Sequence, residues 1–403
     1  MNVLKHILFI SGFILLSGEV VKADPLPGNP VVFALDPQTL KNNKARINAK
    51  DASIMPAYNL LIKDATKGLK FGPVSVMEKT NLPPSGDKHD YMSLAPYHWP
   101  DPTKPGGLPY IRKDGQTNPE VKEYKDKEYM PALCDAAQTL ALAYYFSGDN
   151  SYAEHAAKLL RVWFLDEATR MNPNLNYAQA IKGTNEGRGA GLIDSRHFIK
   201  IVDAIGLLYD SKYWKKENQQ GMKKWFRDFL NWMQTSENGI DELDAPNNHG
   251  AWYDAQRLSL ALFVDSIELA KKIVLNAEDR LDKQMDNEGK FPKEMERTIS
   301  LHYTCFVMNA FFTIAQMAKQ TGVDLWNYKS PSGKSLKKGF DQLLPYLSME
   351  KEWEGQQIKE FDFEEDAFPL LIRGEKFGCR KCRQAIKNVS GDKAGRLRLN
   401  LLY

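Results

Sequence analysis

The sequence predicts an all-α fold: an α/α toroid, or incomplete α/α barrel, built from helical hairpins. After Glu128, apolar residues recur at helical spacing in successive segments that short turns separate, and few segments alternate as strands do. Helices paired through short turns bury their apolar faces against each other as hairpins. No repeat of fixed length stands out, so the ankyrin, TPR and leucine-rich classes are not supported.

The expected helices follow one another along most of the chain. They are expected at Ala57–Thr66, Met130–Phe146, Tyr152–Phe164, Ile193–Tyr209, Trp214–Thr235, Tyr253–Val274, Leu301–Thr321 and Leu336–Leu347. Residues 71–128 differ, because they are rich in Pro, Gly, Asp and aromatic residues and show no periodicity. A long irregular segment inside a compact domain is usually functional. We therefore expect this Pro- and aromatic-rich segment to lie over the cleft at one end of the toroid.

The N-terminus has the pattern of a secretory signal peptide. Lys5 precedes an apolar stretch from Ile7 to Leu16, and a small residue, Ala23, follows at the expected cleavage site. The apolar stretch is too short for a membrane span. We expect residues 1–23 to be removed, residues 24–403 to form a single catalytic domain, and the protein to be periplasmic or secreted without stable membrane insertion.

Composition excludes several classes of protein. With 43% hydrophobic and 11% aromatic residues the chain can form a sizeable core, which excludes global disorder. The formal charge is +3 and no long basic run is present, so nucleic acid is not an expected partner. A locally basic cleft for an acidic polysaccharide is compatible with this balance, and we expect a monomer.

The four cysteines do not predict a metal site. Cys379 and Cys382 have the spacing of half a zinc site, but no second CxxC or HxxxH pair completes it. Disulfides are permitted outside the cytoplasm. Cys134 and Cys305 lie in apolar helical patterns and are expected to be buried free thiols. No metal and no cofactor are predicted.

Two segments carry the chemistry: NNHGAWYDAQ at 247–256 and ERTISLHY at 296–303. The candidate catalytic residues in them are Asn248, His249, Arg297 and Tyr303. An amide, an imidazole and a fixed cation can neutralise a carboxylate, while a phenol or an imidazole moves protons. This combination suits abstraction of a proton next to a carboxylate, and it indicates a lyase acting on uronic-acid polysaccharides.

Each of these residues also has an ordinary structural interpretation. Asn247 or Asn248 is a good helix N-cap, and a single tyrosine at the start of an apolar helix is more often a core residue. Arg297 could form a surface pair with Glu294 or Glu296. The grouping of all four candidates favours a site.

A phenol needs help to act as a base. With a reference pKa of about 10, its ionisation at pH 8 costs roughly 2.7 kcal/mol. A neighbouring arginine favours the phenolate, so we expect Arg297 to lower the pKa of Tyr303.

Further residues are candidates for substrate binding. Within TNEGRGAGLIDSRHF (184–198) the glycine spacing, with no strand before it, is a weak phosphate-loop signal. Delivery of polar groups to sugar carboxylates fits that segment better, whereas its Asp194 and Arg196 are expected to pair structurally. Aromatic rings around 97–99 could stack on sugars or fix the loop to the core. The acidic run 364–366 is expected to be a solvated face or a helix start. The substrate-binding candidates are Tyr97, His98, Trp99, Asn185, Arg188, Trp252 and His302.

These motifs resemble the alginate lyase family, on the chondroitin AC/alginate lyase type of toroid. The branch most similar is polysaccharide lyase family 38, with family 5 more distant. The resemblance runs from about Tyr91 to Thr321 and rests on DYMSLAPYHWPDP, GRGAGLIDSR and the two segments above. It implies β-elimination on a uronate polymer without a cofactor.

The resemblance also implies a role for each candidate. Asn248 and Arg297 would engage the C6 carboxylate and acidify the C5 proton. His249 would assist that neutralisation or act as the base. Tyr303 would protonate the O4 leaving group and could also take the C5 proton in a syn elimination, while Asn185, Arg188 and the Tyr97–Trp99 segment would line the subsites.

The expected function is therefore a lyase acting on alginate, preferring mannuronate-rich regions. Glucuronan is the nearest competing substrate, because it presents the same carboxylate. An inverting glycoside hydrolase is the rival enzyme class, with Asp241, Glu242 and Asp244 as the local carboxylates. A non-catalytic protein that binds oligouronates is the third possibility.

Overall fold

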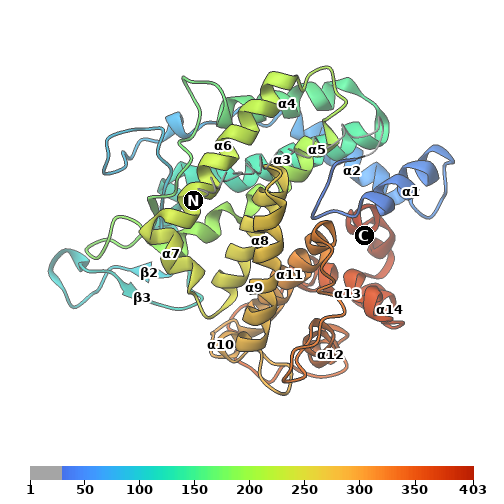
Figure 1. Ribbon diagram of the computed structural model, residues 1–403. Coiled ribbons are helices and arrows are strands. Elements are labelled where there is room, and N and C mark those ends of the chain that lie inside the picture. The colour runs from blue at the N-terminus through green and yellow to red at the C-terminus, as the bar shows by residue number, and fades with distance from the viewer. Residues whose placement is uncertain (1–29) are drawn as a thin grey trace, which may run out of the picture.

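The computed structural model describes residues 30–403, so the expected signal peptide lies outside the described residues. Helices dominate the described chain (Figure 1). They are α1 Pro37–Asn48, α2 Met55–Gly68, α3 Lys125–Ser147, α4 Asn150–Phe164, α5 Phe198–Leu207, α6 Lys216–Thr235, α7 Glu237–Leu243, α8 Asn248–Phe263, α9 Ile267–Gln284, α10 Pro292–Met295, α11 Ser300–Ala318, α12 Leu336–Leu347, α13 Phe368–Gly374, α14 Cys382–Ser390 and α15 Leu399–Leu402. None of the helices in residues 30–403 is long and apolar enough to cross a membrane.

The helices form the α/α toroid that the sequence predicts. An inner series runs α3, α5, α8, α11 and α13, each packed on the next, and the outer helices α4, α9, α12 and α14 cover α3, α8, α11 and α13 in turn. The two ends of the described chain meet, because α15 contacts both α1 and α2 (Figure 1). Inner helix α8 is buried almost all round, as expected of a helix covered on several sides.

Local sequence signals explain several helix boundaries. Helix α3 ends at Gly148, whose φ of 75° suits glycine, and Asp149 then caps α4 by accepting a hydrogen bond from the Ser151 N–H.

Two expected helices are wrong in part. Tyr253–Val274 is split into α8 and α9, because Asp265, with φ of 62°, reverses the chain between two apolar faces.

The expected helix Ile193–Tyr209 is α-helical only in α5. Residues Gly189–His197 form 3-10 turns instead. Glycines explain the tighter path, since a Cβ at Gly191 would lie 2.4 Å from the Ala178 carbonyl oxygen. This close approach packs the glycine-rich segment against strand β4, Tyr177–Ala180.

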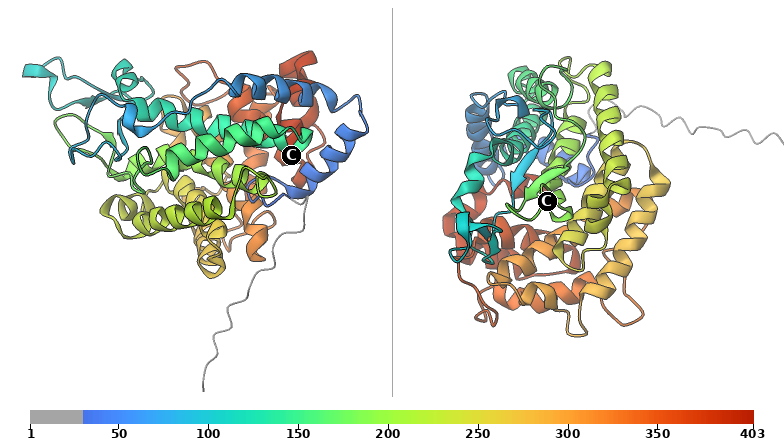
Figure 2. Two further views of the ribbon diagram at one scale, coloured as in Figure 1. Left: turned by 90° about the horizontal axis from the view of Figure 1, so that it is seen from above. Right: turned by 90° about the vertical axis from the view of Figure 1, so that its left-hand side faces the viewer.

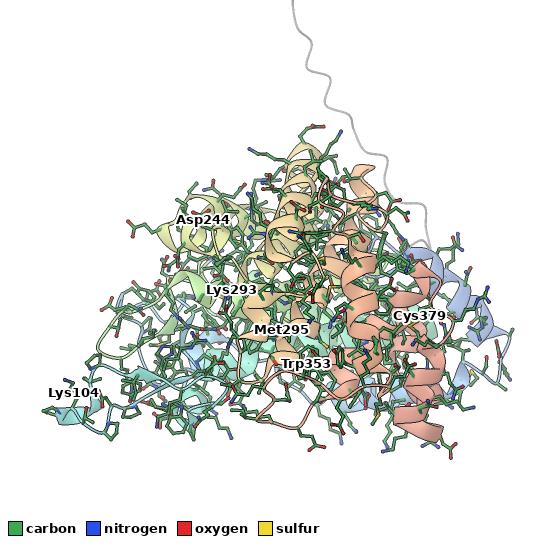
Figure 3. The ribbon with its side chains drawn as sticks, turned by 90° about the horizontal axis from the view of Figure 1, so that it is seen from below. Lys104, Asp244, Lys293, Met295, Trp353 and Cys379 are labelled. Carbon is green, nitrogen blue, oxygen red and sulfur yellow. A yellow bond between two sulfur atoms is a disulfide. The ribbon has the colours of Figure 1, made fainter. Side chains whose placement is uncertain are left out.

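The irregular segment contains short strands and 3-10 turns. Strand β1, Met92–Leu94, pairs in parallel with β4, and β2, His98–Trp99, pairs antiparallel with β3, Ile111–Arg112. The β2–β3 hairpin projects from one side of the helical body (Figures 1 and 2), and Lys104 marks its tip in Figure 3. The base of this hairpin lines the main cavity, through Tyr97 among others, as the sequence predicted.

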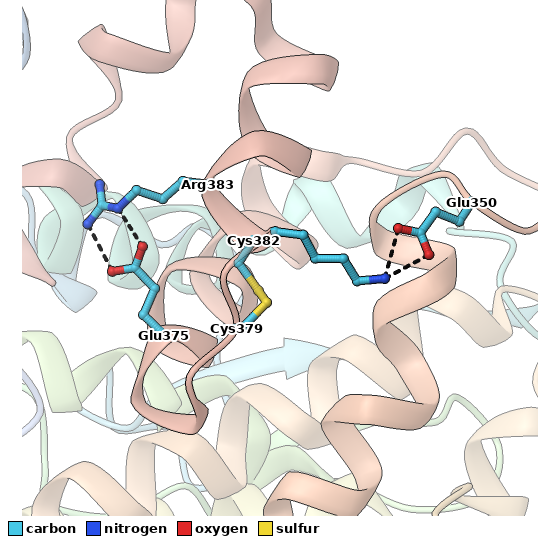
Figure 4. Close-up of a disulfide and its surroundings, with 6 residues drawn as sticks. Glu350, Glu375, Cys379, Cys382 and Arg383 are labelled. Carbon is cyan, nitrogen blue, oxygen red and sulfur yellow. Dashed lines mark hydrogen bonds and ion pairs between the residues drawn. A yellow bond between two sulfur atoms is a disulfide. The ribbon is translucent and has the colours of Figure 1, made fainter.

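The cysteines fall into two groups. Cys379 and Cys382 form a disulfide at the start of α14 (Figure 4), so this pair is not half of a zinc site. Two exposed ion pairs flank it, Lys381–Glu350 and Arg383–Glu375. Cys134 and Cys305 are free and buried, which confirms the prediction.

Candidate active site

A cavity of about 1240 Å³ opens at the end of the toroid where the irregular segment lies. Its walls come from that segment, from the β4–α5 connection, and from the N-terminal turns of α8 and α11. It brings together nine of the eleven candidate site residues: Tyr97, His98, Arg188, Asn248, His249, Trp252, Arg297, His302 and Tyr303.

Two candidates lie outside the cavity lining. Asn185 closes a tight turn, with its Oδ1 accepting the Ile181 N–H over 3.1 Å. The indole N–H of Trp99 donates to the Gln116 carbonyl oxygen, and Lys113 lies over its ring. The structure thus gives both side chains local roles within their loops.

The first turn of α8 carries Asn248 and His249 into the cavity wall. Asn247, as expected, caps the helix by accepting the His249 N–H over 3.2 Å. Gly250 has no space for a side chain, because a Cβ there would lie 2.4 Å from the Ala245 carbonyl oxygen. Asn247 is therefore the helix cap, and the neighbouring candidates Asn248 and His249 are not needed for that role.

His249 is oriented by a buried carboxylate. Its Nδ1 lies 2.8 Å from Oε1 of Glu242, whose side chain is 2% exposed. Because an ionised carboxylate only accepts hydrogen bonds, Nδ1 carries the proton when His249 is neutral. Nε2 then has its lone pair free to accept a proton or a hydrogen bond.

Asn248 is held by a second carboxylate. Its backbone N–H and its Nδ2 both donate to Glu294, over 2.6 Å and 2.9 Å. Both residues are 1% exposed. The Oδ1 atom of Asn248 is buried without a hydrogen-bond partner, an arrangement that a ligand could complete.

The Tyr303 hydroxyl lies between another phenol and a cation. It donates to the Tyr97 hydroxyl over 2.9 Å, and the guanidinium of Arg297 lies 3.6 Å from its ring centroid. Burial, reinforced by Tyr97, raises the pKa of Tyr303, and Arg297 opposes this shift without overcoming it. The expectation that the pKa would be lowered is therefore wrong, because desolvation of the charged phenolate outweighs the nearby cation.

Arg297 is fixed by Asp114, which follows strand β3. Its Nε and Nη2 donate to the carboxylate, the shortest contact being 2.7 Å. Burial alone would raise the pKa of Asp114, but hydrogen bonds from Arg297, the Thr298 N–H and Arg112 hold it well below its ordinary value. The alternative interpretation, in which Arg297 forms a surface pair with Glu294 or Glu296, is not found among the described ion pairs, because Glu294 faces Asn248 and Glu296 faces Lys293.

His302 is paired with a residue that the sequence placed on a solvated face. Its Nδ1 lies 2.8 Å from Oδ2 of Asp366, which is 5% exposed. The imidazole also stacks on Phe306 at 5.7 Å between centroids. The acidic run is thus a solvated face only in part, because its third residue turns inward to the cavity.

The β4–α5 connection supplies the basic side of the cavity. Arg188 donates to Gln179 over 2.8 Å, and its Nε is buried without a partner. The expected pairing of Asp194 with Arg196 is not among the described ion pairs. Asp194 instead accepts hydrogen bonds from Lys127 and from the irregular segment, which it thereby ties to the core. Arg196 donates to a backbone carbonyl oxygen.

Sequence reasoning missed four carboxylates that orient candidate residues: Asp114, Glu242, Glu294 and Asp366. Each contacts a residue between 7 and 183 positions away. Three of them had been named in other roles: Glu242 as a hydrolase carboxylate, Glu294 as a surface partner of Arg297, and Asp366 as part of a solvated acidic run. The single local signal for Asp114 was an Asp-Gly pair, which is typical of any turn.

Comparison with known proteins agrees with the geometry. The family model for alginate lyase matches residues 75–353. An alginate lyase from Bacteroides ovatus has a similar solved structure, with a TM-score of 0.88 and 41% identity over 93% of this chain and 99% of that one. Alginate lyase A1-III from Sphingomonas species A1 shares the fold, with a TM-score of 0.56 and 15% identity over 94% of this chain and 99% of that chain.

The comparison with curated proteins found no match. The family match covers more than half of the chain and includes both segments that carry the candidate catalytic residues. It assigns the chain to the polysaccharide lyases rather than to hydrolases or to non-catalytic binding proteins. The protein is therefore a member of the alginate lyase family.

Proposed function

We propose that this enzyme cleaves alginate by β-elimination, prefers mannuronate-rich regions, and releases 4,5-unsaturated uronate oligosaccharides. The observation that carries this proposal is the buried Tyr303 hydroxyl, which shares one cavity with Arg297, Asn248 and His249. The relative from Bacteroides ovatus, described as an alginate lyase, supports the choice of polymer.

Tyr303 is suited to protonate the leaving group. Because the pKa of Tyr303 is raised, its hydroxyl keeps its proton at neutral pH. Elimination breaks the bond between C4 and O4, and the departing oxygen needs a proton. We assign Tyr303 as the donor of that proton.

Asn248 and Arg297 would engage the C6 carboxylate. Removal of the C5 proton pushes negative charge onto that carboxylate, and each well-placed donor to a developing oxyanion supplies about 3 kcal/mol. Arg188 and His98, which line the same cavity, would bind neighbouring sugars, and Trp252 offers an aromatic edge.

The residue that acts as the base depends on whether the enzyme cleaves at mannuronate or at guluronate. In mannuronate the C5 proton and O4 require a syn elimination, in which the ionised form of Tyr303 takes the C5 proton and then donates that proton to O4. Since the pKa of Tyr303 is raised, the rate on polymannuronate should increase with pH. In guluronate the groups act from opposite faces, and His249, whose Nδ1 is engaged by Glu242, would use Nε2 as the base.

We also propose that the enzyme acts outside the cytoplasm. The N-terminal pattern of residues 1–23 supports this, and the Cys379–Cys382 disulfide is compatible with an oxidising compartment. Expression of the full chain in a bacterial host, followed by fractionation, tests the location. Recovery of an uncleaved protein in the cytoplasm would contradict it.

Ultraviolet absorbance with four polymers tests the substrate. Polymannuronate, polyguluronate, glucuronan and a neutral glucan are compared, since elimination leaves a double bond conjugated to the carboxylate. We expect the fastest rise on polymannuronate and none on the glucan. A faster rise on glucuronan would favour the competing substrate.

A further inference from the structure

The contact between Asn248 and Glu294 is incomplete as it stands. One carboxylate oxygen accepts the backbone N–H of Asn248, the other accepts its Nδ2, and the amide Oδ1 is left buried and unpaired. A buried polar atom without a hydrogen-bond partner destabilises the folded state. Asn248 lines the cavity, so a bound substrate is the natural partner for the free end of its amide.

The unpaired Oδ1 of Asn248 can only accept a hydrogen bond, which does not suit the carboxylate of a uronate. A sugar carboxylate carries no proton at neutral pH and can only accept hydrogen bonds. The two ends of an asparagine amide have nearly the same shape, and the surrounding hydrogen bonds decide which end points where. An ionised Glu294 binds the NH₂ group and leaves the oxygen free, which would repel the substrate.

We propose that Glu294 is a positioning residue that, as a neutral carboxylic acid, holds Asn248 with its NH₂ group directed at the substrate carboxylate. In this state the O–H of Glu294 donates to Oδ1 of Asn248, and its other oxygen still accepts the backbone N–H. The Nδ2 of Asn248 is then the free end. The inference rests on the proposed function, because it is the uronate that demands a donor.

The surroundings of Glu294 favour its neutral form. Burial raises the pKa of Glu294, while the two hydrogen bonds from Asn248 and the charges of Arg297 and His249 lower it without reversing the shift. Arg297, on the turn after α10, donates its hydrogen bonds to Asp114. His249, on α8, faces Glu242. Each of the two basic neighbours is thus engaged by another carboxylate.

Two substitutions separate the protonated form from the ionised one. Glu294→Gln copies the neutral acid, because its carbonyl oxygen can accept the backbone N–H and its NH₂ group can donate to Oδ1 of Asn248. Glu294→Ala removes both contacts. Loss of one donor to a developing oxyanion lowers kcat by about 10²–10³. We expect that loss in Glu294→Ala, and in Glu294→Gln a kcat/KM close to wild type.

The pH dependence gives a signature that a merely structural role would not produce. Ionisation of Glu294 at high pH should turn the amide and lower kcat/KM on polymannuronate, which opposes the increase that ionisation of Tyr303 produces. Glu294→Gln cannot ionise, so that alkaline fall should disappear in this variant. Thermal unfolding of both variants checks folding. A Glu294→Gln variant as inactive as Glu294→Ala, with both folded, would overturn the proposal.

Infrared difference spectroscopy tests the protonation state without any substrate. Wild type minus Glu294→Gln, at neutral pH, should show the C=O stretching band of one protonated carboxyl group. A difference spectrum with only carboxylate bands would overturn the proposal. If wild type fails to eliminate any uronate polymer, the proposed function fails instead, and the infrared band still decides the state of Glu294.

Discussion

Arg297 lies over the ring of Tyr303, 3.6 Å from its centroid, while its Nε and Nη2 donate to Asp114. One arginine thus joins the base of the β2–β3 hairpin to the first turn of α11. The hydroxyl of Tyr303 also donates to the hydroxyl of Tyr97, which precedes the same hairpin. The irregular segment therefore positions Tyr303, the residue that we propose for proton transfer, as well as covering the cavity.

Asp114→Asn should loosen Arg297 and lower activity. Hydrogen bonds to charged groups contribute about 1.5–3 kcal/mol each, so a tenfold or larger fall in kcat/KM is expected. Asp101→Asn is the matched control, because Asp101 lies on the same hairpin but accepts hydrogen bonds from Thr103 and not from an arginine. Equal activities of the two variants would contradict this role of Asp114.

Acid sensitivity should also depend on Asp114. The pKa of Asp114 is depressed in the folded state, so its stabilising contribution is present above the unfolded value of about 4 and is lost as pH falls below it. The free energy of unfolding of wild type should therefore decrease more than that of Asp114→Asn between about pH 5 and pH 3. Urea unfolding at both pH values measures this, and parallel decreases would count against it.

Asp366→Ala should release His302 while leaving the fold largely intact. Without the carboxylate at Nδ1, the imidazole loses the contact that fixes its tautomer. We expect KM for the polymer to rise several-fold, since His302 lines the cavity, with a smaller change in kcat. Asp366→Asn, which keeps an oxygen acceptor, should recover much of the loss. An unchanged KM in both variants would exclude a binding role.

The Cys379–Cys382 disulfide should matter little for catalysis. The two cysteines are 3 positions apart in the sequence, so the disulfide closes a very short loop. The loop-closure entropy of such a loop stabilises the folded state by about 2 kcal/mol. Cys382→Ser should lower the melting temperature modestly and leave kcat/KM unchanged, because neither cysteine lines the cavity. A strong loss of activity at a temperature where the variant is folded would show a wider role.

The sequence predicted the helical toroid well, because α4 and α6 have strong apolar periodicity, α3 and α11 are long and largely apolar, and their ends carry ordinary turn signals. It failed at Asp265, where a single residue with positive φ reverses the chain without interrupting the apolar pattern. It also misjudged the pKa of Tyr303. Burial of a side chain depends on long-range packing, which local sequence does not reveal.

The same reason explains the missed carboxylates. Asn248, His249, Arg297 and Tyr303 stand in two short motifs whose chemistry can be read directly. Asp114, which holds Arg297, lies 183 positions away and reaches it only because the base of the β2–β3 hairpin lies beside the start of α11. Partners of this kind require the tertiary structure.

Tyr303→Phe gives the most direct test of the account. Wild type and variant are incubated with polymannuronate, and both ultraviolet absorbance and new reducing ends are followed. The replacement keeps the ring under Arg297 and removes only the hydroxyl, so the variant should fold like wild type. We expect absorbance and reducing ends to rise together in wild type, and neither to rise appreciably in the variant. A full rate in Tyr303→Phe, or reducing ends without absorbance in wild type, would contradict elimination by this phenol.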